Sequence, residues 1–393
     1  MVLQIPKTEI LARQQSFKEK FRKEGIDGAI VYASIDIFYL TAFHFRPSER
    51  PIALIFDPQG ESHLFVPLME KGHAEAYAHV DHLHDYPEYP GIQHPMNILK
   101  DYLTSIGMAN IHVGIDGDGY SSPKGYRGPK LSDILVNQYT SIYGLIESMR
   151  MVKSENELAL IKTSVRWANY AHELLVNYSK VGRSEIEIET KATSEATIAM
   201  VETLGPDYIP NGSPAHAFYR GQIGPHSAFP HSQTQNLRLE TGYNVVSQAA
   251  AHVYGYISEL ERTMFIEEVS KEQEKYFHHI KTAQDIAFEH IKPGAKASSV
   301  DAAVQAYFKE EGVHHLTLHH TGHALGLVHT HEAPFFDLGD DTTLEAGMVF
   351  SVEPGLFVEG LGGFRHSDTI VVTKDGMEQL TYYPRDLESL IIT

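Results

Sequence analysis

The sequence contains no cysteine. Disulfide bonds, thiolate metal ligands and a cysteine nucleophile are therefore all excluded. Any catalysis or metal binding must use carboxylates, histidines and neutral polar groups instead. A chain without cysteine also fits the cytoplasm, and we expect it there.

Long apolar runs and excess positive charge are missing as well. No stretch approaches the roughly 18 apolar residues that a membrane span requires. The N-terminal segment MVLQIPKTEILARQQ lacks the apolar core and the cleavage site of a signal peptide. Asp and Glu outnumber Lys and Arg by 51 to 32, which gives a formal net charge of -19. Such a surface should repel nucleic acid and anionic membranes, so a small-molecule or peptide ligand is expected.

The length of 393 residues predicts two domains, because single domains cluster around 100 to 200 residues. Helical and strand-like patterns alternate in the first third, which predicts a small α/β domain over residues 1–150. From residue 151 to 393, long amphipathic helices alternate with strands whose short connections favour antiparallel pairing. Capping-box spacings at Ser154, Ser184 and Ser270 mark the starts of three of these helices. The second domain is therefore predicted to be α+β with a curved antiparallel sheet.

The segment NVVSQAAAHVYGYISELERTMFI predicts a β-hairpin with three polar residues, Gln248, Glu259 and Glu261, among apolar ones. A turn near Val253 and Tyr254 would place Gln248 opposite Glu259. Because side chains alternate along strands, the three polar groups would share one face, with the two carboxylates roughly 6.5 to 7 Å apart. That face could hold a cation or a polar substrate, or it could simply meet solvent.

Further polar groups lie downstream. The stretch LHHTGHALGLVHTHEAP is rich in histidine, VFSVEPGL places Glu353 in an apolar strand, and GGFRHSDTIVV adds Arg365 and Ser367. The zinc signature HExxH is absent. A carboxylate such as Glu353 is costly to bury unless it is paired or functional, so Glu353 is predicted to be a site residue.

Together these motifs carry a family resemblance. GHALG with HEAP, then SVEPGL and GGFRHSDTIVV, all after the hairpin, resemble the pita-bread family of methionine aminopeptidases, prolidases and creatinases. GPHSAFPHS resembles the segment with that family's active-site histidine. The resemblance covers nearly the whole chain. It implies a C-terminal pita-bread domain after an N-terminal domain of the creatinase and prolidase type.

The peptidases of this family bind two divalent metals, and the resemblance allows their ligand positions to be compared. The corresponding positions here are Gln248, Glu259, His323, Glu353 and Ser367. Two carboxylates are thus replaced by neutral side chains, so a second metal should be absent. A single Mn, Co or Zn ion held by Glu259, His323 and Glu353 is chemically possible. The absence of any metal is the first expectation.

Creatinase is the metal-free branch, and LERT in the hairpin is similar to its sequence. This resemblance implies that Glu261 and Glu353 hold a substrate guanidinium, that His231 transfers protons and that His323 is retained in the site. His226 is close to His231 in the sequence and is the position to test against it.

The substrate contacts implied by the resemblance are Arg50, Tyr256, Glu259 and His331. Arg50 falls where creatinase contributes an arginine from the neighbouring subunit, which implies a homodimer with shared sites. Glu259 stands where creatinase has a small side chain, and this departure predicts a different substrate.

The leading hypothesis is a metal-independent, creatinase-like hydrolase of a non-peptide C–N bond, an amidinohydrolase acting on a small guanidino, amidine or N-substituted amino acid. The first alternative is a metal-dependent Xaa-Pro dipeptidase or aminopeptidase with an altered site of at most one metal. The second is a catalytically inactive binding module.

Overall fold

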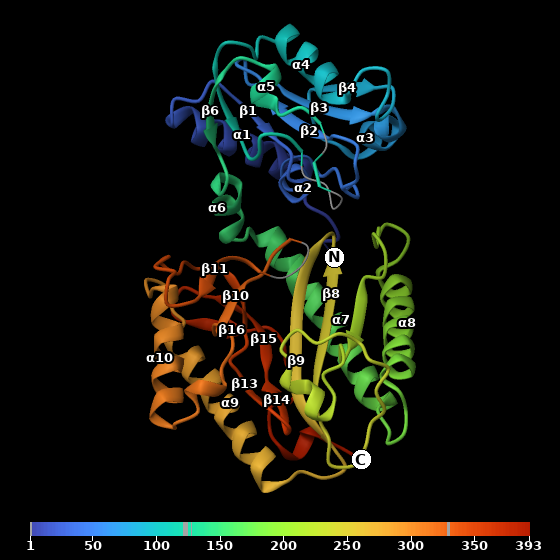
Figure 1. Ribbon diagram of the computed structural model, residues 1–393, viewed down its shortest axis with the longest axis vertical. Coiled ribbons are helices and arrows are strands. Elements are labelled where there is room, and N and C mark those ends of the chain that lie inside the picture. Colours follow the sequence, from blue (N-terminus) through green and yellow to red (C-terminus); the bar gives the residue numbers. More distant parts are fainter. Residues whose placement is uncertain (1, 121–124, 127, 328–330) are drawn as a thin grey trace. The chain divides into compact units, whose positions relative to one another are not determined.

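The computed structural model describes the chain except for residues 1, 121–124, 127 and 328–330. His329, one of the histidines in the downstream stretch, lies outside the described residues. The chain divides into two compact units, one formed by Ile5–Met149 and the other by Arg150–Thr393 with the first residues of the chain (Figure 1). Within the part of the chain that the structure describes, no helix is long and apolar enough to cross a membrane.

The N-terminal unit is built on a mixed sheet with the strand order β4-β3-β2-β1-β5-β6. Its strands are β1 (Gly28–Val31), β2 (Ala53–Phe56), β3 (Ser62–Pro67), β4 (His82–Tyr86), β5 (His112–Ile115) and β6 (Gln138–Ser141). Its helices are α1 (Lys7–Lys23), α2 (Ser34–Thr41), α3 (Lys71–Tyr77), α4 (Pro95–Ser105) and α5 (Leu131–Ile134), and α6 (Leu145–Met151) leads into the second unit. Apolar side chains such as Ile30, Phe65 and Leu99 form its buried core. This is the small α/β domain that the sequence predicts.

The C-terminal unit contains an antiparallel sheet with the strand path β11-β10-β12-β15-β9-β8-β7. Its strands are β7 (Ala215–Phe218), β8 (Asn244–Val253), β9 (Tyr256–Ile266), β10 (Gly322–Ala324), β11 (Glu332–Phe336), β12 (Val349–Val352), β13 (Gly355–Val358), β14 (Gly362–Arg365), β15 (Ser367–Val372), β16 (Met377–Gln379) and β17 (Ile391–Ile392). Its α-helices are α7 (Glu155–Tyr178), α8 (Glu185–Leu204), α9 (Lys271–His290) and α10 (Ala297–Glu310). The predicted α+β architecture is confirmed.

Helix starts follow the capping signals in the sequence. At α7, Ser154 accepts a hydrogen bond from the backbone of Glu157, and the Glu157 side chain accepts one from the backbone of Ser154. Ser270 and Gln273 form the same reciprocal pair at α9. These boxes satisfy backbone N–H groups that the first helical turn leaves without partners. Helix α7 then packs its apolar face on β8 and β9 (Figure 1).

The hairpin of β8 and β9 closes through a two-residue turn at Tyr254 and Gly255, whose φ angles are 51° and 79°. Positive φ at both positions is the requirement of the type I′ turn that matches strand twist. Gln248 therefore pairs with Glu261. The predicted pairing of Gln248 with Glu259 is wrong by two residues, because the turn lies one residue later than expected. An even shift keeps side chains on the same face, so the polar groups still converge.

Glu353 occupies a different local position from the one predicted. Strand β12 ends at Val352 and β13 begins at Gly355, so Glu353 lies in the link between two strands rather than within one. Its backbone N–H donates to the carbonyl of Thr321 at 2.8 Å. This contact holds the start of the link beside β10.

Candidate active site

A cavity of about 280 Å³ lies within the C-terminal unit and is lined by charged, histidine and amide side chains. Strands β8, β9, β10 and β14 contribute to it, together with the segment between β7 and β8, the segments on either side of β10 and the link after β12 (Figure 1). The lining residues are Arg220, His231, Gln248, Glu259, Glu261, His319, His320, His323, His331, Glu353 and Arg365. Of the predicted catalytic and substrate-binding residues, the lining includes His231, Glu259, Glu261, His323, His331 and Glu353, but not Arg50 or Tyr256.

His323 is at the centre of the carboxylates. Its Nε2 atom lies 3.2 Å from Oε1 of Glu353 and 3.7 Å from Oε2 of Glu259. All three side chains are buried. On its other side, Nδ1 lies 3.0 Å from the carbonyl of Ala324. When Nδ1 donates to that carbonyl, the ring is held with Nε2 directed at the two carboxylates.

Gln248 acts on Glu259 as a donor. Its Nε2 atom donates to Oε1 of Glu259 at 2.9 Å, which leaves Oε2 on the side of His323. That Oε2 atom is buried and has no hydrogen-bond partner among the described residues. An orphaned buried carboxylate oxygen is costly unless a cation reaches it.

The protonation states follow from this crowding. Burial lowers the pKa of His323, but the hydrogen bond and charge of Glu353 outweigh it and raise the pKa to about 9. Burial raises the pKa of Glu353, while contact with the His323 imidazolium reverses the effect and holds it below its ordinary range. Burial and the charge of Glu353 raise the pKa of Glu259. A proton on His323 thus occupies the place between the two carboxylates.

Arg365 supplies a second positive charge on the opposite side of the carboxylates. Its Nη2 atom donates to Oε1 of Glu261 at 2.7 Å, and its Nε atom lies 3.8 Å from Oε2 of Glu353. Burial raises the pKa of Glu261 to about 8, although the Arg365 charge opposes the shift.

The residues present do not fit two metal ions. Gln248 presents an N–H donor to Glu259, where a cation would require an acceptor. The Ser367 hydroxyl is buried and shares a hydrogen bond of 2.5 Å with Ser351. The guanidinium of Arg365 already occupies Glu261 as its hydrogen-bond donor.

One divalent ion does fit. Glu259, His323 and Glu353 offer two carboxylates and an imidazole, a donor set suited to zinc or a similar ion. Their nearest ligand atoms are only 3.2 and 3.7 Å apart. Glu353 belongs to two groups whose ligand atoms all lie within 4.8 Å of one another, one with His323 and His331 and the other with Glu259 and Glu261. The orphaned oxygen of Glu259 marks the place where a cation would bind.

His231 lies at the exposed rim of the cavity, and its ring centroid is 6.4 Å from that of His331. Burial and the charge of Arg220 lower its pKa, so the imidazole is neutral at pH 7. The His331 ring stacks on His323 at 4.2 Å. His226 is exposed and lies outside the residues that line the cavity. The geometry thus distinguishes His231 from His226.

Arg220 is a lining residue that the sequence analysis missed. It follows β7, and its φ of 52° is held by hydrogen bonds from the backbone of Tyr219 and Arg220 to Glu189. Its Nη2 atom donates to the carbonyl of Pro230, while its buried Nε atom has no hydrogen-bond partner among the described residues. The available signal was a charged residue before glycine in AFYRGQIG, which is too weak to identify a site.

Tyr256 lies away from the cavity. It is buried, it is absent from the lining, and its hydroxyl donates to Glu157 at 2.7 Å. This geometry does not favour the predicted substrate contact and shows instead how β9 is tied to α7.

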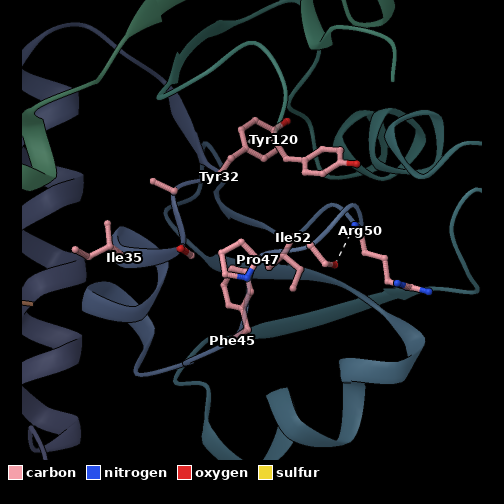
Figure 2. A pocket seen from close by; sticks show the side chains of 10 residues that line it. Tyr32, Ile35, Phe45, Pro47, Arg50, Ile52 and Tyr120 are labelled. Atoms are coloured by element: carbon pink, nitrogen blue, oxygen red, sulfur yellow. Dashed lines mark hydrogen bonds between the residues drawn. The ribbon is translucent and has the colours of Figure 1, made fainter. Parts of the chain in front are cut away.

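Arg50 belongs to the N-terminal unit, where it lines a separate cavity (Figure 2). Its backbone N–H donates to Ser48, and its guanidinium points away from Phe45 and Pro47 to pair with Glu49 and Glu88. Its contribution to the site of a partner subunit stays a prediction.

Comparison with known families finds two matches that together span most of the chain. Residues 159–374 match the model of metallopeptidase family M24. Residues 13–152 match that of the creatinase/prolidase N-terminal domain.

Individual relatives are similar over their whole length. The "Putative dipeptidase YkvY" of Bacillus subtilis is 27% identical, with 95% of this chain and 99% of the relative covered. Among solved structures, an Xaa-Pro dipeptidase from Bacillus anthracis is 25% identical, with a TM-score of 0.78. The match covers 96% of this chain and 99% of the dipeptidase. The dipeptidase PepE from Mycobacterium ulcerans, at 24% identity, shares the fold with a TM-score of 0.82 over 99% of both chains.

These similarities overturn the leading hypothesis from the sequence. The prediction of a metal-independent, creatinase-like amidinohydrolase is wrong, because the matching family is one of metallopeptidases and the relatives carry dipeptidase names. The retained Glu261 and Glu353 suggested guanidinium binding, but Glu261 already binds the chain's own guanidinium, that of Arg365. The findings favour the metal-dependent dipeptidase that stood as the alternative.

Proposed function

Because the chain belongs to metallopeptidase family M24, we propose that it is a dipeptidase that hydrolyses substrates of the Xaa-Pro class with one divalent metal ion. The observation that carries this proposal is the convergence of His323 with Glu353 and Glu259, at 3.2 and 3.7 Å, in a buried cavity. When bound there, the metal would act as a Lewis acid and lower the pKa of water.

The charges of the cavity support a dipeptide as substrate. A dipeptide carries one positive and one negative end, and the carboxylates of the cavity would repel the negative end. Arg365 is already paired with Glu261, whereas Arg220 has no carboxylate within salt-bridge distance among the described residues. Arg220 is therefore the group that binds the substrate carboxylate, with its free N–H groups as donors.

The remaining residues orient the substrate and transfer protons. Neutral His231 accepts a proton from the water that attacks the scissile carbonyl and delivers it to the leaving nitrogen as the C–N bond breaks. Glu259 and Glu353 would hold the metal together with His323, and Gln248 fixes the rotamer of Glu259 through its amide hydrogen bond. The pair of Arg365 and Glu261 closes the back of the cavity and maintains its charge balance.

The test is a substrate panel on protein stripped of metal and reloaded with Mn, Co or Zn. Ala-Pro and Leu-Pro should be hydrolysed, and activity should saturate at one metal ion per chain. Tripeptides and dipeptide amides should react at least tenfold more slowly. A folded protein that hydrolyses no dipeptide with any of the three metals would refute the proposal.

Matched histidine variants test the roles of the site residues. His323→Ala should lose both the metal and the activity, as measured by elemental analysis. His231→Ala should keep the metal and lose activity by about 100-fold or more, the usual contribution of a general acid and base. His226→Ala is the control, because this histidine lies outside the cavity lining and should behave as wild type.

A further inference from the structure

A second group of potential metal ligands lies in the N-terminal unit. The side chains of Glu61, His63 and His82 each offer a ligand atom, and these atoms all lie within 4.8 Å of one another. They line a surface hollow of about 530 Å³ together with Asp57 and Tyr102. We call these five side chains the β3–β4 cluster.

The strand register places the two histidines. His63 on β3 and His82 on β4 are direct partners in a parallel pair, so both imidazoles stand on the same face. Their ring centroids are 4.6 Å apart and their planes differ by 23°. Glu61 is two residues before His63 and therefore shares that face, and its Oε2 atom lies 2.9 Å from Nε2 of His82.

His63 has the surroundings of a metal ligand. It is buried, Nδ1 lies 2.8 Å from the hydroxyl of Tyr102, and Nε2 lies 3.2 Å from Oδ2 of Asp57. If Nδ1 carries the proton and donates to Tyr102, the lone pair of Nε2 is available to a cation beside Asp57. Metal-bound histidines are typically held in this way by a partner on the other ring nitrogen.

The spacing of the ligand atoms also suits a small cation. In a tetrahedral site with metal–ligand bonds of 2.0 to 2.1 Å, neighbouring ligand atoms are about 3.3 Å apart. The pair of His63 and Asp57 is at 3.2 Å and that of His82 and Glu61 is at 2.9 Å. His82 and Glu61 are partly exposed, so their side chains can turn onto the ion.

We propose that the β3–β4 cluster is a binding site for a divalent transition metal ion of the zinc class, with Glu61, His63 and His82 as its ligands and Asp57 beside His63. Imidazole and carboxylate ligands together favour zinc, nickel or copper over magnesium or calcium. The site joins the edge strand β4 to its neighbour β3 and does not depend on the proposed peptidase activity.

The experiment uses the full-length chain with the His323→Ala substitution, which removes the metal of the cavity. After equilibrium dialysis against zinc, elemental analysis should find about one zinc ion per chain. Adding His82→Ala should abolish this zinc, and Glu61→Ala should weaken its binding at least tenfold. Both side chains are partly exposed, so the variants should fold, which circular dichroism checks.

His73→Ala in the same background is the matched control. His73 forms an exposed pair with Glu70 at 3.2 Å, so it resembles the His82 and Glu61 pair without being part of the β3–β4 cluster. Zinc content should be unchanged in this variant. In a parallel measurement, Cu(II) added in place of zinc should give an electron paramagnetic resonance spectrum with nitrogen couplings from two imidazoles. Equal zinc content with and without His82, or copper without these couplings, would overturn the proposal.

Discussion

Arg365 donates to the carboxylate of Glu261 at 2.7 Å, with both side chains buried inside the cavity. The pair forms across two strands, since Arg365 ends β14 and Glu261 lies within β9. In a family of metallopeptidases, this internal guanidinium binds a side chain that would otherwise be available to a metal ion together with Glu259 and Glu353. The cavity therefore combines a built-in cation on one side with room for a metal ion on the other.

Removal of Arg365 should be more destabilising than removal of its partner. Arg365→Met leaves Glu261 buried without a positive charge, and breaking a buried pair in this way costs about 3 kcal/mol. Glu261→Gln should cost about half as much, since the guanidinium keeps Glu353 at 3.8 Å and an amide can still accept its hydrogen bond. Urea denaturation measures both. Equal losses in the two variants would show that the guanidinium is not held by Glu261.

Arg220 should control the affinity for dipeptides rather than the chemical step. In Arg220→Gln, KM for Ala-Pro should rise about 10- to 100-fold, the value of one lost charge-assisted hydrogen bond, with kcat changed only a few-fold. In the same variant, the preference for the dipeptide over its amide should disappear, because the substrate carboxylate no longer has Arg220 as a partner. Arg220→Lys keeps the charge, so its KM should lie between those of the wild type and Arg220→Gln. An unchanged KM in Arg220→Gln rules out this role.

The acid limb of the pH profile should report His231. Burial and the charge of Arg220 lower the pKa of His231 below 6.5. The imidazole therefore stays neutral, and able to act as a base, at pH values somewhat below 6.5. Activity is lost only as the pH falls through the lowered pKa. Arg220→Gln removes a positive charge, so the pKa of His231 rises and the limb of kcat/KM moves to higher pH. Arg183→Gln removes the same charge from an exposed pair with Glu187 at the start of α8 and should leave the limb in place. Coincident limbs in all three proteins would contradict the assignment.

Stability at acid pH should depend on His172. Burial, followed by the charge of Arg262, lowers the pKa of this fully buried histidine to about 3. Between pH 6.5 and 3 the unfolded chain binds a proton that the folded chain does not, so the free energy of unfolding decreases as pH falls through this range. The contribution is about 1.4 kcal/mol for each pH unit.

The test compares chemical denaturation at pH 6.5 and 5. His172→Asn should reduce the loss of stability over that interval, although losing the contact with Ser247 lowers stability at every pH. His278→Asn, at an exposed helical position, should leave the pH dependence unchanged. A slope in His172→Asn that matches wild type would mean that this histidine is protonated in the folded state.

The sequence predicted the two-domain organisation, the antiparallel sheet and most of the cavity lining, because these depend on local patterns. Alternation along the hairpin strands sets which side chains share a face, and this holds whatever the register. The pairing of Gln248 could not be predicted, since it depends on whether Tyr254 accepts a positive φ.

Two features of the site were beyond sequence reasoning for different reasons. Arg220 stands alone in a connecting segment, without periodicity or a motif to single it out. Arg365 was noted as part of a motif, but its bond to Glu261 depends on two side-chain rotamers from separate strands. The link that carries Glu353 was likewise read as continuous strand, because the apolar residues on both sides conceal the break.

The hairpin of β8 and β9 has a consequence for how such a site can change over evolutionary time. Its hydrogen-bond ladder is formed by backbone groups, and Gln248 and Glu261 face each other on it as direct partners. Replacing an acid by an amide at one position, or adding an acid at the other, leaves that ladder intact. Charge can therefore change at these positions through single substitutions without loss of the strand pairing.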